Sequence, residues 1–296
     1  MVRSAFRNAE MGTDFQYGLT WEQVNKVNRP SPCLVAWGKV TVCADRPEYG
    51  LFRLDLDHGD GQPLHFHRTR PVAYLVEEGK VLLRQKNRQG MTVSRMVKKG
   101  EVFRADPGVA HSFYGVEESV LYGFTSAQPL REVFLVEESE EAAQNCRGIL
   151  SSGKYEEGAG RTSDFREKYW GTIETVVSQD MAGKRIELRA DSQSSLEFHC
   201  SKVETYYIHS GKVKVGLRIG RGENRSVIVA AGETFEVPPG LMHMRIGIED
   251  SVIIEVSTRD DDRDSHLVED GRTYQHIEPQ GDAEAGAGGS RNEGVS

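Results

Sequence analysis

Four residues in the second half of the chain have the types and the spacing of a metal-binding site. Glu197 and His199 stand two positions apart in S-L-E-F-H-C, among residues that favour strands. Side chains two apart on a strand point to the same face. Glu204 follows five positions after His199, and His243 follows a Pro-Pro-Gly turn that begins at Pro238. Two imidazoles and two carboxylates from three strand segments suit a divalent transition metal.

The chain also contains an internal duplication. His67 precedes His199 by 132 positions, and other pairs repeat this offset: Gly79 and Gly211, Gly100 and Gly232, Gly108 and Gly240, His111 and His243. Trp37-Gly38 precedes Trp170-Gly171 at an offset of 133. An offset that is kept across several landmarks indicates a repeated structural unit. We therefore expect two copies of one small β-domain.

The two copies differ in their candidate ligands. At the same offset, His65 corresponds to Glu197 and Val72 to Glu204, so the first copy offers only histidines: His65, His67 and His111. Three neutral imidazoles can hold a divalent ion with open positions. The two carboxylates of the second copy would also offset the charge of the ion in a low-dielectric interior. We expect the working metal in the second copy, while the first copy either binds a metal or is degenerate.

Strands joined by glycine turns must position these residues. L-F-R-L-D-L-D at 51–57 alternates apolar and polar residues, and P-V-A-Y-L-V-E-E-G-K-V-L-L-R has the pattern of strand, glycine turn and strand. A capping box, Thr20-x-x-Gln23, predicts a short helix that is closed by the prolines near residue 30. A second short helix is expected from Ser139. The pattern predicts an all-β protein of two tandem jelly-roll barrels.

Composition divides the chain into five segments. The expected segments are an N-terminal extension at 1–32, a first barrel at 33–147, a Gly/Ser-rich linker at 148–168, a second barrel at 169–275 and a disordered tail at 276–296.

Charge and composition favour a small-molecule partner. The 296 residues carry a formal charge of −8, and the pI is about 5.7, which argues against nucleic acid or an anionic membrane. The N-terminus lacks the apolar region of a signal peptide. Four cysteines without CxxC spacing predict free thiols in a reducing compartment: Cys33, Cys43, Cys146 and Cys200. We expect a cytoplasmic homo-oligomer, a dimer, with a small-molecule substrate.

The two motif blocks resemble the cupin signature, G-x5-H-x-H-x3,4-E-x6-G followed by G-x5-P-x-G-x2-H. Glu197 stands where the first histidine usually does. The second copy also resembles the phosphomannose isomerase domain of the bifunctional, type II kind. The motifs that carry this resemblance are K-Y-W-G, S-L-E-F-H-C-S-K-V-E, V-P-P-G-L-M-H, I-I-E-V-S-T and D-D-R-D-S-H-L-V-E-D-G-R.

This resemblance implies a ligand set: Glu197 (glutamine in that family), His199, Glu204 and His243. Lys202 falls where that family has arginine. The resemblance covers most of the second copy and little of the first. Other proteins with a similar two-barrel layout include keto-uronate and lyxose-type isomerases, so sugar isomerisation recurs among the neighbours.

The leading functional hypothesis is a metal-dependent isomerase or epimerase that acts on a sugar or sugar phosphate through an enediolate. The metal, which the sequence does not distinguish among Mn, Fe, Zn and Ni, would stabilise the developing charge. Proton transfer would fall to Glu197 as base, with Lys202 and Tyr206 as further catalytic candidates. Arg245 and Lys214 are the candidates for substrate binding.

Two alternatives belong to other classes of protein. The three histidines of the first copy would suit an Fe(II) dioxygenase. A two-barrel protein that binds a sugar without turnover is the other alternative. Oxygen consumption and metal content separate these alternatives from an isomerase.

Overall fold

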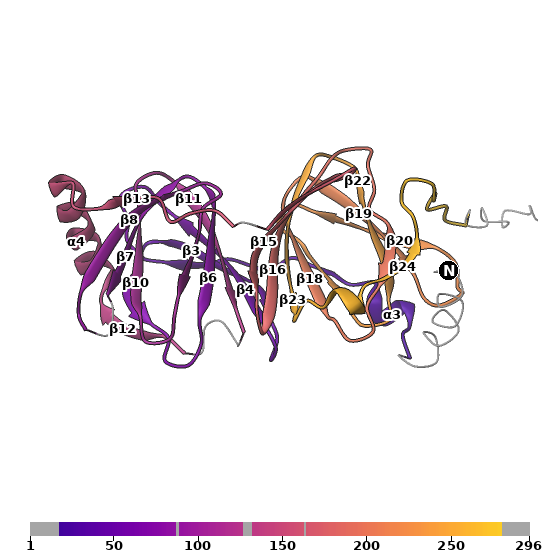
Figure 1. Cartoon of the computed structure of the whole chain (residues 1–296), viewed down its shortest axis with the longest axis horizontal. Coiled ribbons are helices and arrows are strands. Elements are labelled where there is room, and N and C mark those ends of the chain that lie inside the picture. The colour runs from indigo at the N-terminus through magenta and orange to yellow at the C-terminus, as the bar shows by residue number, and fades with distance from the viewer. Residues whose placement is uncertain (1–17, 87–88, 127–131, 163, 280–296) are drawn as a thin grey trace, which may run out of the picture.

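The structure is a computed structural model that describes residues 18–86, 89–126, 132–162 and 164–279. Strands form two domains that lie side by side along the long axis of the molecule (Figure 1). Each domain is built from two sheets, which confirms the two tandem jelly-roll barrels expected from the sequence. We call these domains barrel 1 and barrel 2.

Barrel 1 has two six-stranded sheets with an apolar core between them. Its strands are β2 (Cys33–Val35), β3 (Gly38–Asp45), β4 (Gly50–Leu56), β5 (Leu64–Phe66), β6 (Val72–Glu78), β7 (Lys80–Lys86), β8 (Thr92–Lys98), β9 (Val102–Ala105), β10 (Ala110–Gly115), β11 (Ser119–Thr125), β12 (Phe134–Glu137) and β13 (Glu156–Glu157). One sheet has the order β2-β3-β4-β11-β6-β9, and the other has the order β12-β5-β10-β7-β8-β13.

Barrel 2 has a seven-stranded and a five-stranded sheet. Its strands are β1 (Val27–Asn28), β14 (Phe165–Lys168), β15 (Gly171–Ser178), β16 (Met181–Leu188), β17 (Leu196–Phe198), β18 (Glu204–Ser210), β19 (Lys212–Arg218), β20 (Arg225–Ala230), β21 (Thr234–Val237), β22 (Met242–Gly247), β23 (Ser251–Thr258) and β24 (His266–Glu269). The orders are β1-β21-β18-β23-β16-β15-β14 and β20-β19-β22-β17-β24. A short 3-10 helix, η1 (Asp262–Asp264), precedes β24.

The duplication seen in the sequence extends to the irregular features of the fold. The pairing of β3 with β4 shifts register after Val42, and the pairing of β15 with β16 shifts at the equivalent Thr175. Gly79 and Gly211 join the equivalent hairpins with φ of 75° and 81°. Only glycine adopts this left-handed conformation readily. The same local chemistry therefore produces both copies.

The two barrels share an apolar interface. Tyr122 of barrel 1 packs against Tyr207 of barrel 2, with ring centroids 5.8 Å apart, within a cluster that also includes Ile254. A nearly buried ion pair crosses the same interface, since Arg185 Nε donates to Glu77 Oε2 at 2.6 Å. The seven-stranded sheet of barrel 2 thus faces the barrel-1 sheet that has the order β2-β3-β4-β11-β6-β9 (Figure 1).

The N-terminal segment lies on barrel 2, although barrel 1 follows it in sequence. The expected short helix is present as α3 (Trp21–Val24), in which the Gln23 side chain accepts the Thr20 backbone N–H at 2.9 Å. It ends at Val24, earlier than the prolines predicted. β1 then pairs with β21 of barrel 2, and Figure 1 shows α3 beside that domain.

Residues 148–168, where the sequence predicts a linker, contain regular structure. The expected second helix, α4 (Ser139–Ser152), is longer than predicted, has Glu138 as its N-cap and continues into this segment. It packs Cys146 on barrel 1. Beyond it, β13 pairs with β8 of barrel 1, and β14 pairs with β15 of barrel 2. The chain therefore crosses between the barrels after β13.

Other features bear on the remaining expectations. Residues 280–296 of the expected tail lie outside the described residues. All four cysteines are free. In the part of the chain that the structure describes, no helix has the length and apolar character needed to span a membrane.

Candidate functional site

The two histidines of barrel 2 are oriented by backbone carbonyls. His199 lies just after β17, and its Nδ1 donates to the Asp264 carbonyl at 2.9 Å. His243 lies on β22, and its Nδ1 donates to the Leu241 carbonyl at 3.0 Å. Both Nε2 atoms are buried, and each faces a carboxylate oxygen of Glu204 at 3.3 Å without a hydrogen bond of good geometry. A ring that donates through Nδ1 presents the Nε2 lone pair, which is how proteins orient histidine ligands of metals.

The two predicted carboxylates lie beside these nitrogens. The Oε1 and Oε2 atoms of Glu204 are each 3.3 Å from one Nε2, of His199 and His243 respectively. Glu197 is paired with His243 across β17 and β22, and it supplies an oxygen within 4.8 Å of a ligand nitrogen of both histidines. Glu197, His199 and His243 thus form a group whose donors fit a divalent transition metal, and Glu204 lies against both histidines.

An ionic network lies behind Glu204. Lys202 Nζ is 2.6 Å from Glu204 Oε1, 2.8 Å from Asp260 Oδ1 and 3.4 Å from Glu255 Oε1. Lys184 Nζ joins the network, 2.8 Å from Asp260 Oδ2. Burial would lower the pKa of Lys202, but these carboxylates outweigh burial and raise its pKa well above the usual value. Lys202 is therefore a fixed cation at neutral pH.

Glu204 is held in its ionised form. Tyr206 Oη donates to Glu204 Oε2 at 2.7 Å, so Tyr206 faces inward as expected. Burial opposes ionisation of Glu204, but Lys202 and the two histidines hold its pKa well below the usual value. The carboxylate is thus charged and in place before any ion arrives.

Arg245 and Glu197 form the wall of the site. Arg245 is buried, as expected from its place on β22, and its guanidinium lies 3.3 Å from Glu197 and 3.2 Å from Glu255. It also lies over the rings of Trp170 and Tyr206, at 5.5 and 5.6 Å. Burial alone would raise the pKa of Glu197. Arg245 and the two histidines lower this pKa by more than burial raises it, so it lies below the usual value. Glu197 is therefore ionised.

These residues line a polar cavity of about 520 Å³. Its lining also carries charges of both signs from the start of barrel 2 and from the C-terminal segment: Arg166, Lys168 and Arg272, with Glu167, Asp261 and Asp262. The expectation for Lys214 is wrong in this structure: it lies on β19 between the core residues Val213 and Val215, so its side chain points to the outer face. There it pairs with Glu278.

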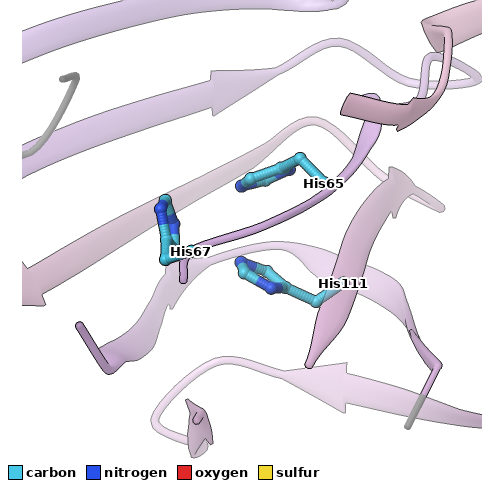
Figure 2. A group of neighbouring side chains, drawn as sticks. All are labelled: His65, His67 and His111. Carbon is cyan, nitrogen blue, oxygen red and sulfur yellow. The ribbon is translucent and has the colours of Figure 1, made fainter. Parts of the chain in front are cut away.

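Barrel 1 brings its three predicted histidines together in the same way. Figure 2 shows the rings of His65, His67 and His111 converging on one space. Their Nδ1 atoms donate to the carbonyls of Pro63, Glu132 and Val109, respectively. Burial lowers the pKa of all three, that of His67 to about 4. Neutral imidazoles with inward Nε2 atoms fit a metal, but Tyr74 Oη lies 2.9 Å from His111 Nε2 and competes for that lone pair.

The charged network of barrel 2 has been replaced in barrel 1. At the offset of 132, the barrel-2 residues Lys184, Lys202, Glu204, Arg245 and Glu255 correspond to Phe52, Arg70, Val72, Phe113 and Gly123. One cation is kept, whereas both carboxylates and two cations are lost. The two interiors therefore suit different ligands, although their backbones are copies.

Sequence reasoning missed three members of the network: Lys184, Glu255 and Asp260. The signal for Glu255 was available, because V-I-I-E-V-S-T places one carboxylate inside an otherwise apolar strand, where an unpaired charge is expensive. The local pattern gives no such signal for Lys184 or Asp260, since charged residues in K-R-I-E-L and T-R-D-D are also typical of exposed positions.

The sequence matches no protein-family model and no curated protein. Solved structures of oxalate decarboxylases are similar in fold. One, described for its substrate binding mode and a reaction specificity switch, has a TM-score of 0.62 at 16% identity and covers 83% of this chain and 80% of its own. A deletion mutant of the Bacillus subtilis enzyme has a TM-score of 0.61 at 16% identity, with coverages of 80% and 78%. A formate complex of the Lactobacillus farciminis enzyme has a TM-score of 0.62 at 14% identity, with coverages of 82% and 88%. The chain shares their two-barrel cupin fold.

Proposed function

We propose that barrel 2 is a metal-dependent catalytic site that moves a proton between neighbouring carbons of a sugar or sugar phosphate. The observation that carries the proposal is the convergence of the buried Nε2 atoms of His199 and His243 with the ionised carboxylates of Glu204 and Glu197 beside a large polar cavity. A bound divalent ion would polarise the carbonyl and the adjacent hydroxyl of the substrate. The resemblance to phosphomannose isomerase supports the choice of substrate class.

Glu197 is the residue that we assign as the base. Its side chain is 25% exposed, compared with 3% for Glu204, so it reaches the space that a substrate would occupy. Ser265 Oγ donates to Glu197 Oε2 at 2.8 Å, and Arg245 contacts the other oxygen. These two contacts orient the carboxylate toward the cavity. Deprotonated Glu197 would accept a proton from carbon and return it to the neighbouring carbon, while the hydroxyl proton passes between the two oxygens of the enediolate.

Lys202 and Tyr206 take supporting roles in this proposal. Lys202 is shared among three carboxylates, so it stabilises the charge of Glu204 and does not transfer protons. Tyr206 donates to Glu204 and fixes its rotamer. Arg245 acts on Glu197 as a positioning residue, because its guanidinium is already engaged by Glu197 and Glu255.

With a divalent ion bound, the charge of the cavity would favour an anionic substrate. The inner groups carry one excess negative charge, which a divalent ion would convert to one excess positive charge; they are Glu197, Glu204, Glu255, Asp260, Lys184, Lys202 and Arg245. Arg272 at the rim is 65% exposed, pairs with Asp270 at 3.5 Å and stacks over Tyr169, 4.5 Å from the ring centroid. An exposed guanidinium of this kind can bind a phosphate. A sugar phosphate would then lie with its carbonyl end inward and its phosphate at the rim.

The test uses metal-reconstituted full-length protein in D2O. Mannose 6-phosphate, fructose 6-phosphate and free aldoses are incubated with the Mn, Fe, Zn or Ni form and followed by NMR. Deuterium incorporation next to the carbonyl is expected, because a carboxylate base exchanges its proton with solvent. This readout detects proton abstraction even where the equilibrium hides net conversion. Neither exchange nor conversion with any of the four metals would overturn the proposal.

A second candidate function follows from the structural neighbours, which are named as oxalate decarboxylases. The three histidines of barrel 1 are the observation that favours it, as they also favour the Fe(II) dioxygenase alternative. Release of CO₂ and formate from oxalate identifies a decarboxylase, and oxygen consumption identifies a dioxygenase. Loss of either activity in His111→Ala, but not in His243→Ala, would assign the activity to barrel 1.

A further inference from the structure

We propose that barrel 1 is a second binding site, whose ligand is a single-ring, largely apolar molecule that carries one hydroxyl or amine. This ligand class differs from the one that we propose for barrel 2. The proposal concerns binding to the side chains of barrel 1 and does not depend on the function proposed for barrel 2.

The cavity of barrel 1 has the size and the lining for such a ring. Its volume is about 160 Å³, and its wall is mainly apolar: Trp37, Val40, Phe52, Leu54, Tyr74, Val133 and Leu135 among its members. An apolar cavity of about 150 Å³ stays dry and accommodates benzene. A sugar would lose most of its hydrogen bonds to water against this wall, so the lining selects against polyols.

Two buried acceptors supply the polar end of the site. Gln62 and His67, 7% and 4% exposed, both line the cavity. Gln62 Oε1 and His67 Nε2 have no hydrogen-bond partner among the described residues. His67 Nδ1 donates to the Glu132 carbonyl, so Nε2 carries the lone pair. Because unsatisfied buried acceptors are costly, these two atoms favour a ligand that donates, such as a phenol, over one that only accepts.

The apolar wall of the cavity reaches the surface at β12 and at Val133 just before it, and we take this as the mouth of the cavity. Leu135 and Val133 line the cavity and are 56% and 42% exposed. At the offset of 132, Leu135 corresponds to Leu267, which is 45% exposed and lines the cavity of barrel 2. The two leucines provide a matched pair for blocking one mouth at a time.

The experiment measures the binding of phenol, toluene and benzoate to full-length protein from which metal has been removed by a chelator. Affinities are taken from NMR titrations. Phenol is expected to bind most tightly, since it combines an apolar ring with one donor. Toluene lacks the donor, and ionised benzoate brings only acceptors. Equal affinity for phenol and toluene would show that the two acceptors select nothing and would overturn the proposal.

Variants then locate the site. Gln62→Leu should weaken phenol binding by about tenfold, the scale of one lost hydrogen bond, while toluene binding is kept. Leu135→Trp narrows the mouth of barrel 1 and should reduce phenol binding, whereas Leu267→Trp in barrel 2 should not. Both leucines are exposed, so their variants should fold, as circular dichroism would check. Phenol binding that survives Leu135→Trp but is lost in Leu267→Trp would place the ligand in barrel 2 and overturn the assignment.

Discussion

Lys202 Nζ lies 2.6 Å from Glu204 Oε1 in the interior of barrel 2, and both side chains are almost completely buried. Their counterparts in barrel 1 are Arg70 and Val72, so the carboxylate of this pair exists in one copy only. A buried carboxylate is stable only when it is paired and hydrogen-bonded. The burial of Glu204 in barrel 2 therefore depends on the rest of the network.

Removal of the lysine should destabilise the protein strongly. Lys202→Met leaves Glu204 and Glu255 without their shared cation, and breaking a buried ion pair costs about 3–5 kcal/mol. Urea unfolding of the metal-free protein measures this loss. Lys212→Met is the control: its pair with Glu249, at 3.7 Å, is exposed, so the change should stay within about 0.5 kcal/mol. Similar losses in the two variants would contradict the role of the network.

Metal content should depend on His243. We expect at least one transition metal per chain, and His243→Ala should remove the ion of barrel 2, because a lost ligand leaves it poorly held. Metal analysis is made in a His111→Ala background so that barrel 1 does not contribute. His58→Ala, at an exposed position, is the control and should keep the metal. Unchanged metal content after His243→Ala would refute the ligand assignment.

Glu197→Gln tests the proposed base. The variant keeps the size and an oxygen ligand but loses basicity, and it recreates the residue of the phosphomannose isomerase family. Turnover should fall by at least ~100-fold with metal retained, the scale of removing a general base. Full activity with metal retained would leave Glu197 as a ligand only. Ser265→Ala, which removes one orienting hydrogen bond, should give a smaller loss.

The stability of the barrel interface should depend on pH through His209. Its Nδ1 and Nε2 contact Tyr122 Oη and Glu78 Oε1, each at 2.9 Å. Burial lowers its pKa; Glu77 and Glu78 oppose this shift and Arg53 adds to it. Folding therefore favours the neutral form of His209. Its contribution to the free energy of unfolding is fully present above the unfolded-state pKa of about 6.5 and is lost as the pH falls below that value.

His209→Gln removes this dependence while keeping a polar side chain. The difference in unfolding free energy between wild type and variant should shrink as the pH falls from 7 to 5. Because only one proton is taken up, this difference in unfolding free energy can change by at most ~1.4 kcal/mol per pH unit. His58→Gln, at an exposed position, should leave the pH profile of the wild type unchanged. A constant difference between wild type and His209→Gln would contradict the prediction.

Spacing predicts which candidate ligands share a face, because a strand has a strict period of two and each turn has a marker residue. His199 and His243 could therefore be placed on one inner face without knowledge of the sheet order. The same period does not place Lys214 correctly, because the charge of a residue does not reveal which of the two alternating sets of side chains on a strand faces inward. Its neighbours Val213 and Val215 already indicate the answer, since they carry the apolar face.

Long-range pairing limits what the sequence predicts. The contact of Lys184 with Glu255 joins residues 71 positions apart, and that of Lys202 with Asp260 depends on how the chain leaves β23. Comparison of the two copies would have exposed part of this network, because Phe52 and Gly123 stand where Lys184 and Glu255 do. Two charges gained at positions that are apolar or small in the other copy indicate a pair.

The pairing of β1 with β21 determines the order in which the protein can be completed during synthesis. Thr234 Oγ1 donates to the Asn28 carbonyl across a separation of 206 residues. At a translation rate of about 5–20 residues per second, β1 leaves the ribosome roughly 10–40 s before its partner strand exists. Barrel 1 can fold in that interval. One edge strand of the seven-stranded sheet in barrel 2, however, is β1, which is synthesised first. A nascent protein thus keeps one unpaired strand until translation is nearly finished.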